Sequence, residues 1–396
     1  MSGQASAGTS ARYPWLDLIR GVAALEVVAG HLKSFMLDGI DKNSNLFVKI
    51  FNIVTGQAHN AVMIFFVLSG YLIGKQVFDR FGQNWSWISY AVRRLSRLWT
   101  VLVLALLMTV IWDYVGLHFL HGALYLGQLA GHRYGGSLPV GDMGSIHTTT
   151  TFFGNLFFLQ NGILVGSFGV NGPLWSLANE FWYYVIFPLS FYAVSSIGRP
   201  LGRIICAAAA IGLCLLLPIY VVLYGGIWLF GVFVVVLEKH TPAHWRERYI
   251  NLLTMGTAGC ILALLLYICP RFLRNEDISD FIISGIFSIL LFMLLNQDIK
   301  IPSLKRSGSF VAKFSYTLYL THFPFLAILL CALSDNQKIS LGFWSLLLCL
   351  LVFLITVLYA IAIYYIFERN TTKVQSYIEG QLLRRLLPLQ LRIPAR

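Results

Sequence analysis

Charged residues are scarce in this sequence. Asp, Glu, Lys and Arg make up 12% of its 396 residues, and hydrophobic residues make up 57%. A water-soluble domain carries about 25% charged residues. The mean hydropathy of +0.72 agrees with this comparison. The composition therefore excludes an ordinary water-soluble domain and predicts an integral membrane protein.

Cysteine is also scarce, and no two cysteines form a closely spaced pair. Each one lies within or at the end of an apolar run: Cys206, Cys214, Cys260, Cys269, Cys331 and Cys349. Isolated cysteines of this kind behave as small hydrophobic residues. We predict that they pack as core residues, and no metal site is expected.

Apolar runs dominate the rest of the chain, and ten of them are long enough to cross a bilayer, at about 20 residues each. They lie at 16–38, 60–79, 93–116, 174–197, 203–219, 221–238, 249–268, 279–296, 312–333 and 340–367. A count of nine or eleven stays open, because two runs almost meet at Pro218 and the stretch 150–168 could be re-entrant. We predict an all-α polytopic membrane protein of about ten transmembrane helices.

Lys and Arg distribute unevenly between the two sides of this arrangement. With a cytoplasmic N-terminus, 21 of the 29 basic residues fall on the inner side, 7 on the outer side, and Arg20 within the first run. The positive-inside rule then places both termini in the cytoplasm. We expect a cytoplasmic tail at 1–12, a transmembrane domain at 13–370 with a long outer loop at about 117–172, and a basic cytoplasmic tail at 371–396.

The net charge of +12 does not predict nucleic-acid binding. The basic residues are scattered over inner loops, and no soluble domain is expected that could bind a duplex. Membrane topology explains the charge better, with anionic lipid of the inner leaflet as a secondary partner. The end of the chain, "LLRRLLPLQLRIPAR", either lies on the inner membrane surface as a basic amphipathic segment or is disordered. The long outer loop likewise either shapes an entrance to a site or is a flexible connection.

The first apolar run, "LDLIRGVAALEVVAGHL", carries four ionisable residues. An Arg or Asp at mid-span costs about 2.5–3.5 kcal/mol, so such groups usually face the protein interior. Arg20 and His31 are eleven positions apart, which places them within about 20° of one helix face and about 16 Å apart along the axis. Asp17 lies three positions before Arg20, near enough to pair with it. A lone His31 would more often be a hydrogen-bonded structural residue.

Other runs supply further polar groups. "FFVLSGYLIG" places Ser69 and Gly70 in an apolar run, a pattern that also serves close helix packing. "YAVRRLSRLWT" places Arg93, Arg94 and Arg97 at the inner end of the third run. Such a cluster suits a phosphate-bearing ligand, although plain positive-inside anchoring explains it as well.

Three more motifs complete the set. "NGPLWSLANEFWYYVIFP" carries Glu180 among aromatic residues that include Trp175, and a carboxylate buried in such surroundings needs a partner. "SYTLYLTHFPF" places His322 near the middle of the ninth run. "YYIFERN" places Glu368 beside Arg369, which could be no more than an ion pair at a helix end.

Together and in this order, these motifs resemble those of the acyltransferase 3 family, polytopic membrane enzymes that acylate hydroxyl groups, mainly on bacterial surface glycans. The family opens with Asp-x-x-Arg-Gly and places a His after the ten residues that follow the Arg, as Asp17, Arg20, Gly21 and His31 do here. The segments "FFVLSGYLI", "RRLSRLW", "LWSLANE", "YTLYLTH" and "FER" resemble its later motifs. The similarity covers about residues 13–370. The form of the family that the sequence resembles is the stand-alone form.

The sequence departs from the family pattern at two places. The third motif commonly ends in Pro where this chain has "LWT", and the last commonly reads Glu-Arg-Pro where this chain has "ERN". These departures concern local loop geometry rather than the chemistry.

The resemblance implies a reaction and its participants. The donor would be cytosolic acyl-CoA, most often acetyl-CoA, with its phosphates at Arg93, Arg94 and Arg97, and no permanently bound cofactor is implied. The acceptor would be a hydroxyl of a glycan or lipid-linked saccharide, at the outer side of a bacterial cytoplasmic (inner) membrane. His31 would act as general base or carry the acyl group briefly. Arg20 would bind the donor or offset negative charge. The remaining expected site residues are Glu180, which would orient the imidazole or a substrate hydroxyl, and the substrate-binding residues Asp17, Ser69, Trp175, Ser176 and His322.

A carrier is the main alternative to an enzyme. A transporter or flippase for a saccharide or an organic anion would also bury Arg, Glu and His in about ten spans. Such folds often contain internal repeats, and no matching halves are found in this sequence. Whether the protein forms a homodimer is left open.

Overall fold

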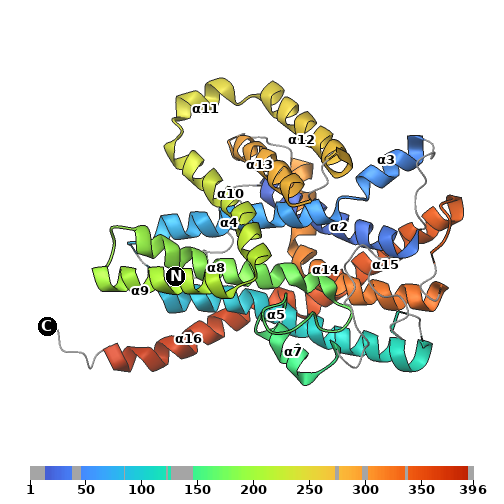
Figure 1. The fold of residues 1–396 in the computed structure, drawn as a ribbon, viewed down its shortest axis with the longest axis horizontal. Helices are drawn as coiled ribbons and strands as arrows, with labels where there is room; N and C mark the ends of the chain where they lie inside the picture. Colours follow the sequence, from blue (N-terminus) through green and yellow to red (C-terminus); the bar gives the residue numbers. More distant parts are fainter. Residues whose placement is uncertain are drawn as a thin grey trace.

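The computed structural model describes residues 14–37, 46–83, 85–121, 124–125, 146–272, 276–296, 302–334 and 338–390. Within these ranges the chain is helical, and its only β-type pairing is an isolated bridge between Leu37 and Ile339. The all-α prediction is therefore confirmed. Figure 1 shows the helices, several of which run side by side along the long axis of the molecule.

Every one of the ten predicted apolar runs lies on a helix. These helices are α2 (Pro14–Met36), α4 (Ala58–Arg80), α5 (Trp87–Val115), α8 (Trp175–Val194), α9 (Pro200–Leu216), α10 (Ile219–His240), α12 (Leu252–Phe272), α13 (Glu276–Leu295), α14 (Pro302–Ser334) and α15 (Phe343–Ile366).

Six helical segments of the described chain are long and apolar enough to cross a membrane: Val48–Arg80, Trp87–Leu120, Ile219–His240, Glu276–Leu295, Arg306–Leu333 and Phe343–Gln381. The helices α2 and α8, which carry the charged motifs, are not among them. The apolar parts of α9 and α12 are shorter than a full span. The number of ten spans therefore stays a prediction.

Short helices connect the long ones. They are α3 (Leu46–Val54), η1 (Gly116–Leu120), α7 (Thr149–Leu156), η2 (Gly172–Leu174), α11 (Ala243–Tyr249) and η3 (Glu368–Asn370). The C-terminal tail forms α16 (Thr371–Gln390), so most of the tail is helical rather than irregular. Its last six residues lie outside the described chain.

The centre of the molecule is built from α2, α4, α5 and α14, with α8 and α10 packed beside them (Figure 1). Glycines allow two of these helix pairs to approach closely. A Cβ on Gly70 of α4 would lie 1.9 Å from the carbonyl oxygen of Trp228 on α10, and a Cβ on Gly231 would lie 1.9 Å from that of Val67. A Cβ on Gly21 of α2 would lie 2.8 Å from Val311 of α14. Small residues at helix crossings are the usual way in which membrane helices pack tightly.

The described part of the long outer loop, residues 146–171, folds back onto the helices. Asn171 donates hydrogen bonds to Thr109 on α5 and to the carbonyl oxygen of Leu320 on α14. Asp113 of α5 accepts from the Val170 amide and lies 2.7 Å from Nε2 of His147. This part of the loop is therefore packed against the helix ends. Residues 126–145 of the loop lie outside the described chain.

Candidate functional site

A cavity lies between α2, α4, α5, α8 and α14, and it holds most of the predicted site residues. Its charged lining consists of Arg20, Arg94, Arg97 and Glu180. Its volume is about 80 Å³, which holds several water molecules or a small polar group. Phe65, Phe66 and Leu72 are part of the apolar remainder of the lining.

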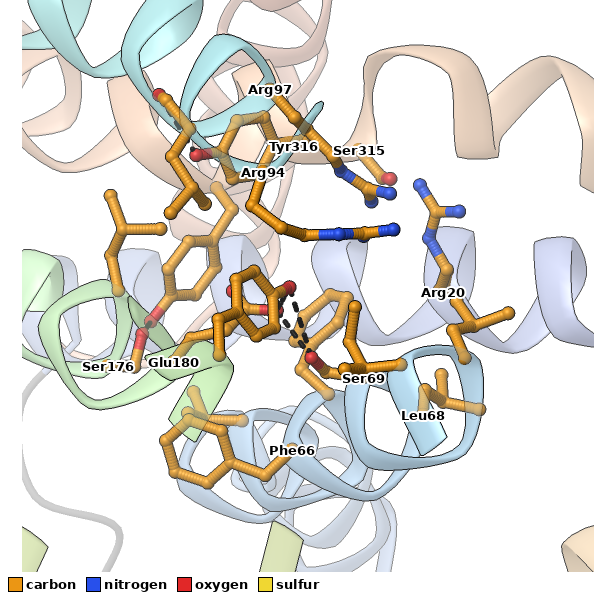
Figure 2. A pocket seen from close by; sticks show the side chains of 18 residues that line it. Arg20, Phe66, Leu68, Ser69, Arg94, Arg97, Ser176, Glu180, Ser315 and Tyr316 are labelled. Atoms are coloured by element: carbon orange, nitrogen blue, oxygen red, sulfur yellow. Dashed lines mark hydrogen bonds between the residues drawn. The ribbon is translucent and has the colours of Figure 1, made fainter. Parts of the chain in front are cut away.

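The three guanidinium groups converge in this cavity. Figure 2 shows Arg94 and Arg97 reaching from α5 toward Arg20 on α2. Arg20 lies 3.9 Å from Asp17 and 3.4 Å from the carbonyl oxygen of Ala312. Because like charges repel and burial removes water, three arginines in one cavity favour an anionic ligand.

The arginines differ in how many protein partners they have. Arg94 donates a hydrogen bond to Gln76, and its guanidinium lies 5.7 Å from the ring centres of Tyr90 and Tyr184. Arg97 forms no hydrogen bond or ion pair with any described residue, and its side chain lines the cavity. It is thus the arginine whose donors are most available to a ligand.

Arg93 does not line the cavity, although it was expected to meet the donor together with its two neighbours. Its Nη1 donates a 2.5 Å hydrogen bond to Ser89 and lies 3.7 Å from a carboxylate oxygen of Glu379 on α16. One helical turn further along, Arg97 faces the cavity instead. The cationic group in the cavity is therefore Arg20, Arg94 and Arg97.

A hydrogen-bonded cluster forms the wall opposite the arginines. Oε1 of Glu180 accepts hydrogen bonds from the hydroxyls of Tyr184 and Ser69, the second at 2.6 Å. The indole of Trp228 donates to Ser69 at 3.2 Å. These contacts supply the partner that a buried carboxylate needs, and they hold the Glu180 carboxylate in the cavity rather than beside His31.

The two predicted histidines form a pair outside this cavity lining. Nδ1 of His31 lies 2.8 Å from Nε2 of His322, and the two rings are stacked with their centres 5.1 Å apart. Nδ1 of His322 lies 3.0 Å and 2.9 Å from the carbonyl oxygens of Leu318 and Tyr319. Only an N–H can bond to a carbonyl oxygen, so Nε2 of a neutral His322 accepts the proton of His31 Nδ1. That leaves Nε2 as the basic nitrogen of His31.

Tyr319 connects the histidine pair with the cavity. It lines the cavity, and its ring centre lies 6.1 Å from that of His322. Its hydroxyl lies 2.7 Å from that of Ser176 and donates to the carbonyl oxygen of Pro173 at 3.1 Å. The predicted residue Ser176 thus lies in the cavity wall together with Tyr319. The predicted residue Trp175 directly precedes Ser176 in the chain.

Glu368 lies behind the cavity rather than in its lining. Its carboxylate accepts hydrogen bonds from the amide, at 3.2 Å, and from the hydroxyl of Thr317 on α14. It also acts electrostatically on Arg97 and Arg20. Glu368 therefore attaches the end of α15 to α14 and partly balances the arginine charge, while Arg369 packs over Tyr365.

The sequence analysis missed the tyrosines of the site. Tyr184, Tyr316 and Tyr319 all line the cavity. The signal was present, because Tyr184 follows Glu180 by four residues and Tyr319 precedes His322 by three, the spacings that share a helix face. Among the described residues, no group of three or more His, Cys, Asp or Glu is placed to hold a metal ion.

The fold and the cavity define a helical membrane protein with a buried cationic site. A family model described as an acyltransferase domain, that of the acyltransferase 3 family, matches residues 13–365. This is nearly the whole chain, and the protein belongs to this family of membrane acyltransferases. Neither the curated proteins nor the solved structures contain a match.

Proposed function

We propose that the protein is an acyl-CoA-dependent O-acyltransferase that acylates a hydroxyl of a glycan or lipid-linked saccharide, with acetyl-CoA as the expected donor. We place it in the bacterial cytoplasmic membrane with both termini inside. The observation that carries the proposal is the convergence of Arg20, Arg94 and Arg97 on one cavity, opposite a single carboxylate of Glu180.

The arginine cavity suits the phosphates of the donor. Guanidinium groups bind phosphate oxygens in pairs of hydrogen bonds, and Arg97 has donors that no described residue uses. A volume of about 80 Å³ admits a phosphate or an acyl group but not a whole nucleotide. The adenosine would therefore lie outside the cavity, at the end where α5 begins, which the positive-inside rule places in the cytosol.

The histidine pair suits the transfer step. In this step, Nε2 of His31 takes the proton from the acceptor hydroxyl, and the oxygen of that hydroxyl attacks the thioester carbonyl. The carbon–sulfur bond breaks, and the leaving thiolate takes the proton from the imidazolium. The products are the ester and free coenzyme A. His322 supports the step by accepting the Nδ1 hydrogen bond, which orients the ring and spreads the positive charge.

The path between the two parts of the site passes Tyr319. Arg20 and His31 are about 16 Å apart along α2, a separation that an extended pantetheine arm is suited to span. Tyr319 lines the cavity, and its ring centre lies 6.1 Å from that of His322, so the thioester would pass beside this ring on its way to His31.

The proposal is tested with purified protein in lipid nanodiscs, labelled acetyl-CoA and a lipid-linked saccharide fraction as acceptor. The variants are Arg97→Ala and, as a matched control on the same helix, Arg93→Ala. A hydrogen bond to a charged group contributes about 1.5–3 kcal/mol, so the first variant should raise the KM for acyl-CoA by about tenfold or more. The control should change it less than about threefold.

Two outcomes would contradict this proposal. Equal KM changes in the two variants would show that the cavity arginines do not bind the donor. Movement of the saccharide across the membrane without formation of a labelled ester would identify a carrier instead of an enzyme.

A further inference from the structure

A second cluster of polar and aromatic side chains lies apart from the arginines, where four helices begin. His59 is the second residue of α4, Trp175 is the first of α8, and Tyr224 and Asp280 lie in the second turns of α10 and α13. Gln76, the partner of Arg94, lies 17 residues further along α4 than His59, which corresponds to about 25 Å of helix. The cluster therefore lies at the opposite end of α4 from the arginines, which the positive-inside rule places outside.

A histidine and a carboxylate form the polar part of this cluster. Nε2 of His59 lies 2.7 Å from Oδ2 of Asp280, whose side chain is only 3% exposed. The His59 side chain is 45% exposed. The buried carboxylate accepts a hydrogen bond from the Nε2–H of His59, so Nδ1 is left at the exposed edge of the ring, where it can hydrogen-bond with a hydroxyl group. It forms no hydrogen bond with another described residue.

Aromatic rings form the apolar part. The His59 ring is stacked on Trp175 at 6.3 Å between centres and 21° between planes. Tyr224 lies 6.4 Å from His59 and 5.9 Å from Trp175. All three side chains are partly exposed. Rings grouped around the polar edge of one imidazole suit a ligand with an apolar face and hydroxyl groups, as a sugar ring has.

The charges around the cluster favour a neutral ligand. Among the described residues, the charged groups that act most strongly on His59 are Asp280, Glu276 and Asp277, all of them acidic. Such a setting repels phosphates and other anions. The cluster is therefore surrounded by negative charge, whereas the arginine cavity is positively charged, and the two sites suit different substrates.

The cluster also adjoins the cavity. Phe66 lines the cavity and packs edge-on against Trp175, with ring centres 5.9 Å apart. Ser176, the residue after Trp175, lines the cavity as well. A molecule held at the cluster therefore lies next to the near end of the cavity, while Arg94 lies toward the far end of α4.

We infer that His59, Asp280, Trp175 and Tyr224 form an acceptor subsite that binds a neutral sugar unit. The sugar ring packs on Trp175 and Tyr224, and one of its hydroxyls forms a hydrogen bond with Nδ1 of His59. Asp280 holds the imidazole in the orientation that this bond requires. This inference rests on the proposed function, because it takes the protein as an acyltransferase. It adds the side of the membrane on which the acceptor binds.

Saturation-transfer NMR tests the subsite without acyl-CoA, so the result does not depend on acyl transfer. The probes are maltotriose and chitotriose, both neutral, added to protein in nanodiscs. His59→Gln keeps a hydrogen-bond donor for Asp280, and Tyr224→Ala removes one ring. Each should weaken binding of at least one probe by about fivefold or more. Leu223→Ala, an exposed neighbour on α10, is the matched control and should leave binding unchanged.

Three results would overturn the subsite. The first is the absence of saturation transfer from the wild-type protein to either trisaccharide. The second is equal binding by the wild-type protein and both cluster variants. The third is stronger binding of the anionic trigalacturonate than of the neutral probes. In the transfer assay, His59→Gln should raise the KM for the saccharide and leave the KM for acyl-CoA unchanged, and the reverse pattern would also contradict the inference.

Discussion

Single residues of α2 show why an apolar helix carries several charges. Arg20 faces the cavity, and His31 pairs with His322. Glu26 has a structural role, because it accepts a 2.9 Å hydrogen bond from the Gln57 amide just before α4 begins. Each of these polar groups lies against protein, which is how intramembrane charge is usually accommodated.

The histidine pair gives a prediction at this scale. His31→Ala should lower kcat by about 10²–10⁴-fold because it removes the proposed base. His322→Phe removes the acceptor for His31 Nδ1, and it should lower kcat by about tenfold or more. His322→Gln restores an acceptor and should recover part of the loss. The measurement is labelled acetyl transfer at saturating acyl-CoA.

A positioning role for His322 requires that kcat falls while the KM for acyl-CoA stays the same. Thermal unfolding of the variants in nanodiscs serves as the control for folding. Full activity of a correctly inserted His31→Ala protein would remove this histidine from the mechanism.

Among the helices, the crossing of α4 and α10 determines where the wall of the site stands. Gly70 lies directly after Ser69, and the backbone of α10 lies against it. The same contact brings Trp228 to Ser69, which holds Glu180. The glycine motif and the polar cluster are therefore parts of one helix interface.

Substitution of Gly70 tests this crossing. Gly70→Ala introduces a Cβ only 1.9 Å from a backbone oxygen, so the two helices must separate, at a cost of about 1–3 kcal/mol. We expect a lower thermal unfolding temperature and lower transfer activity. Gly212→Ala, where no atom lies within 4 Å, is the control and should be neutral or stabilising by up to about 1 kcal/mol. Equal unfolding temperatures for the two variants would contradict the close crossing.

At the scale of the whole molecule, the proposal depends on orientation. The arginines lie where α5 begins, and the His59 cluster lies where α4 begins, at opposite ends of the helices. The arginines therefore face cytosolic acyl-CoA, and the His59 cluster faces an acceptor outside, only if the N-terminal side is cytosolic.

Labelling of engineered cysteines tests the orientation. Thr149→Cys lies at an exposed position of the outer loop and Thr372→Cys lies at an exposed position of α16. In a background with the exposed Cys260 changed to Ala, a membrane-impermeant maleimide should label the first variant in intact cells. It should label the second only after the membrane is opened. The reverse pattern would contradict both the orientation and the proposed approach of the substrates.

The order and class of the elements follow from local properties of the sequence. Apolar runs and helical spacing do not depend on distant residues, so all ten predicted runs lie on helices. The motif residues could be identified in the same way, because a polar group within an apolar run is visible in the local sequence and is energetically unfavourable in a membrane. The short helix α3 was missed, because few residues and no full span leave little local pattern, while α7 lies mostly in the stretch 150–168 that could be re-entrant.

The grouping of the site residues followed from packing instead. The sequence predicts that Arg93, Arg94 and Arg97 act together, but Arg93 lies beside Glu379 of α16, and only Arg94 and Arg97 line the cavity. His31 finds its partner 291 positions away in the sequence, because α2 and α14 pack together along their length. No local pattern encodes which helices become neighbours, so those contacts required the folded molecule.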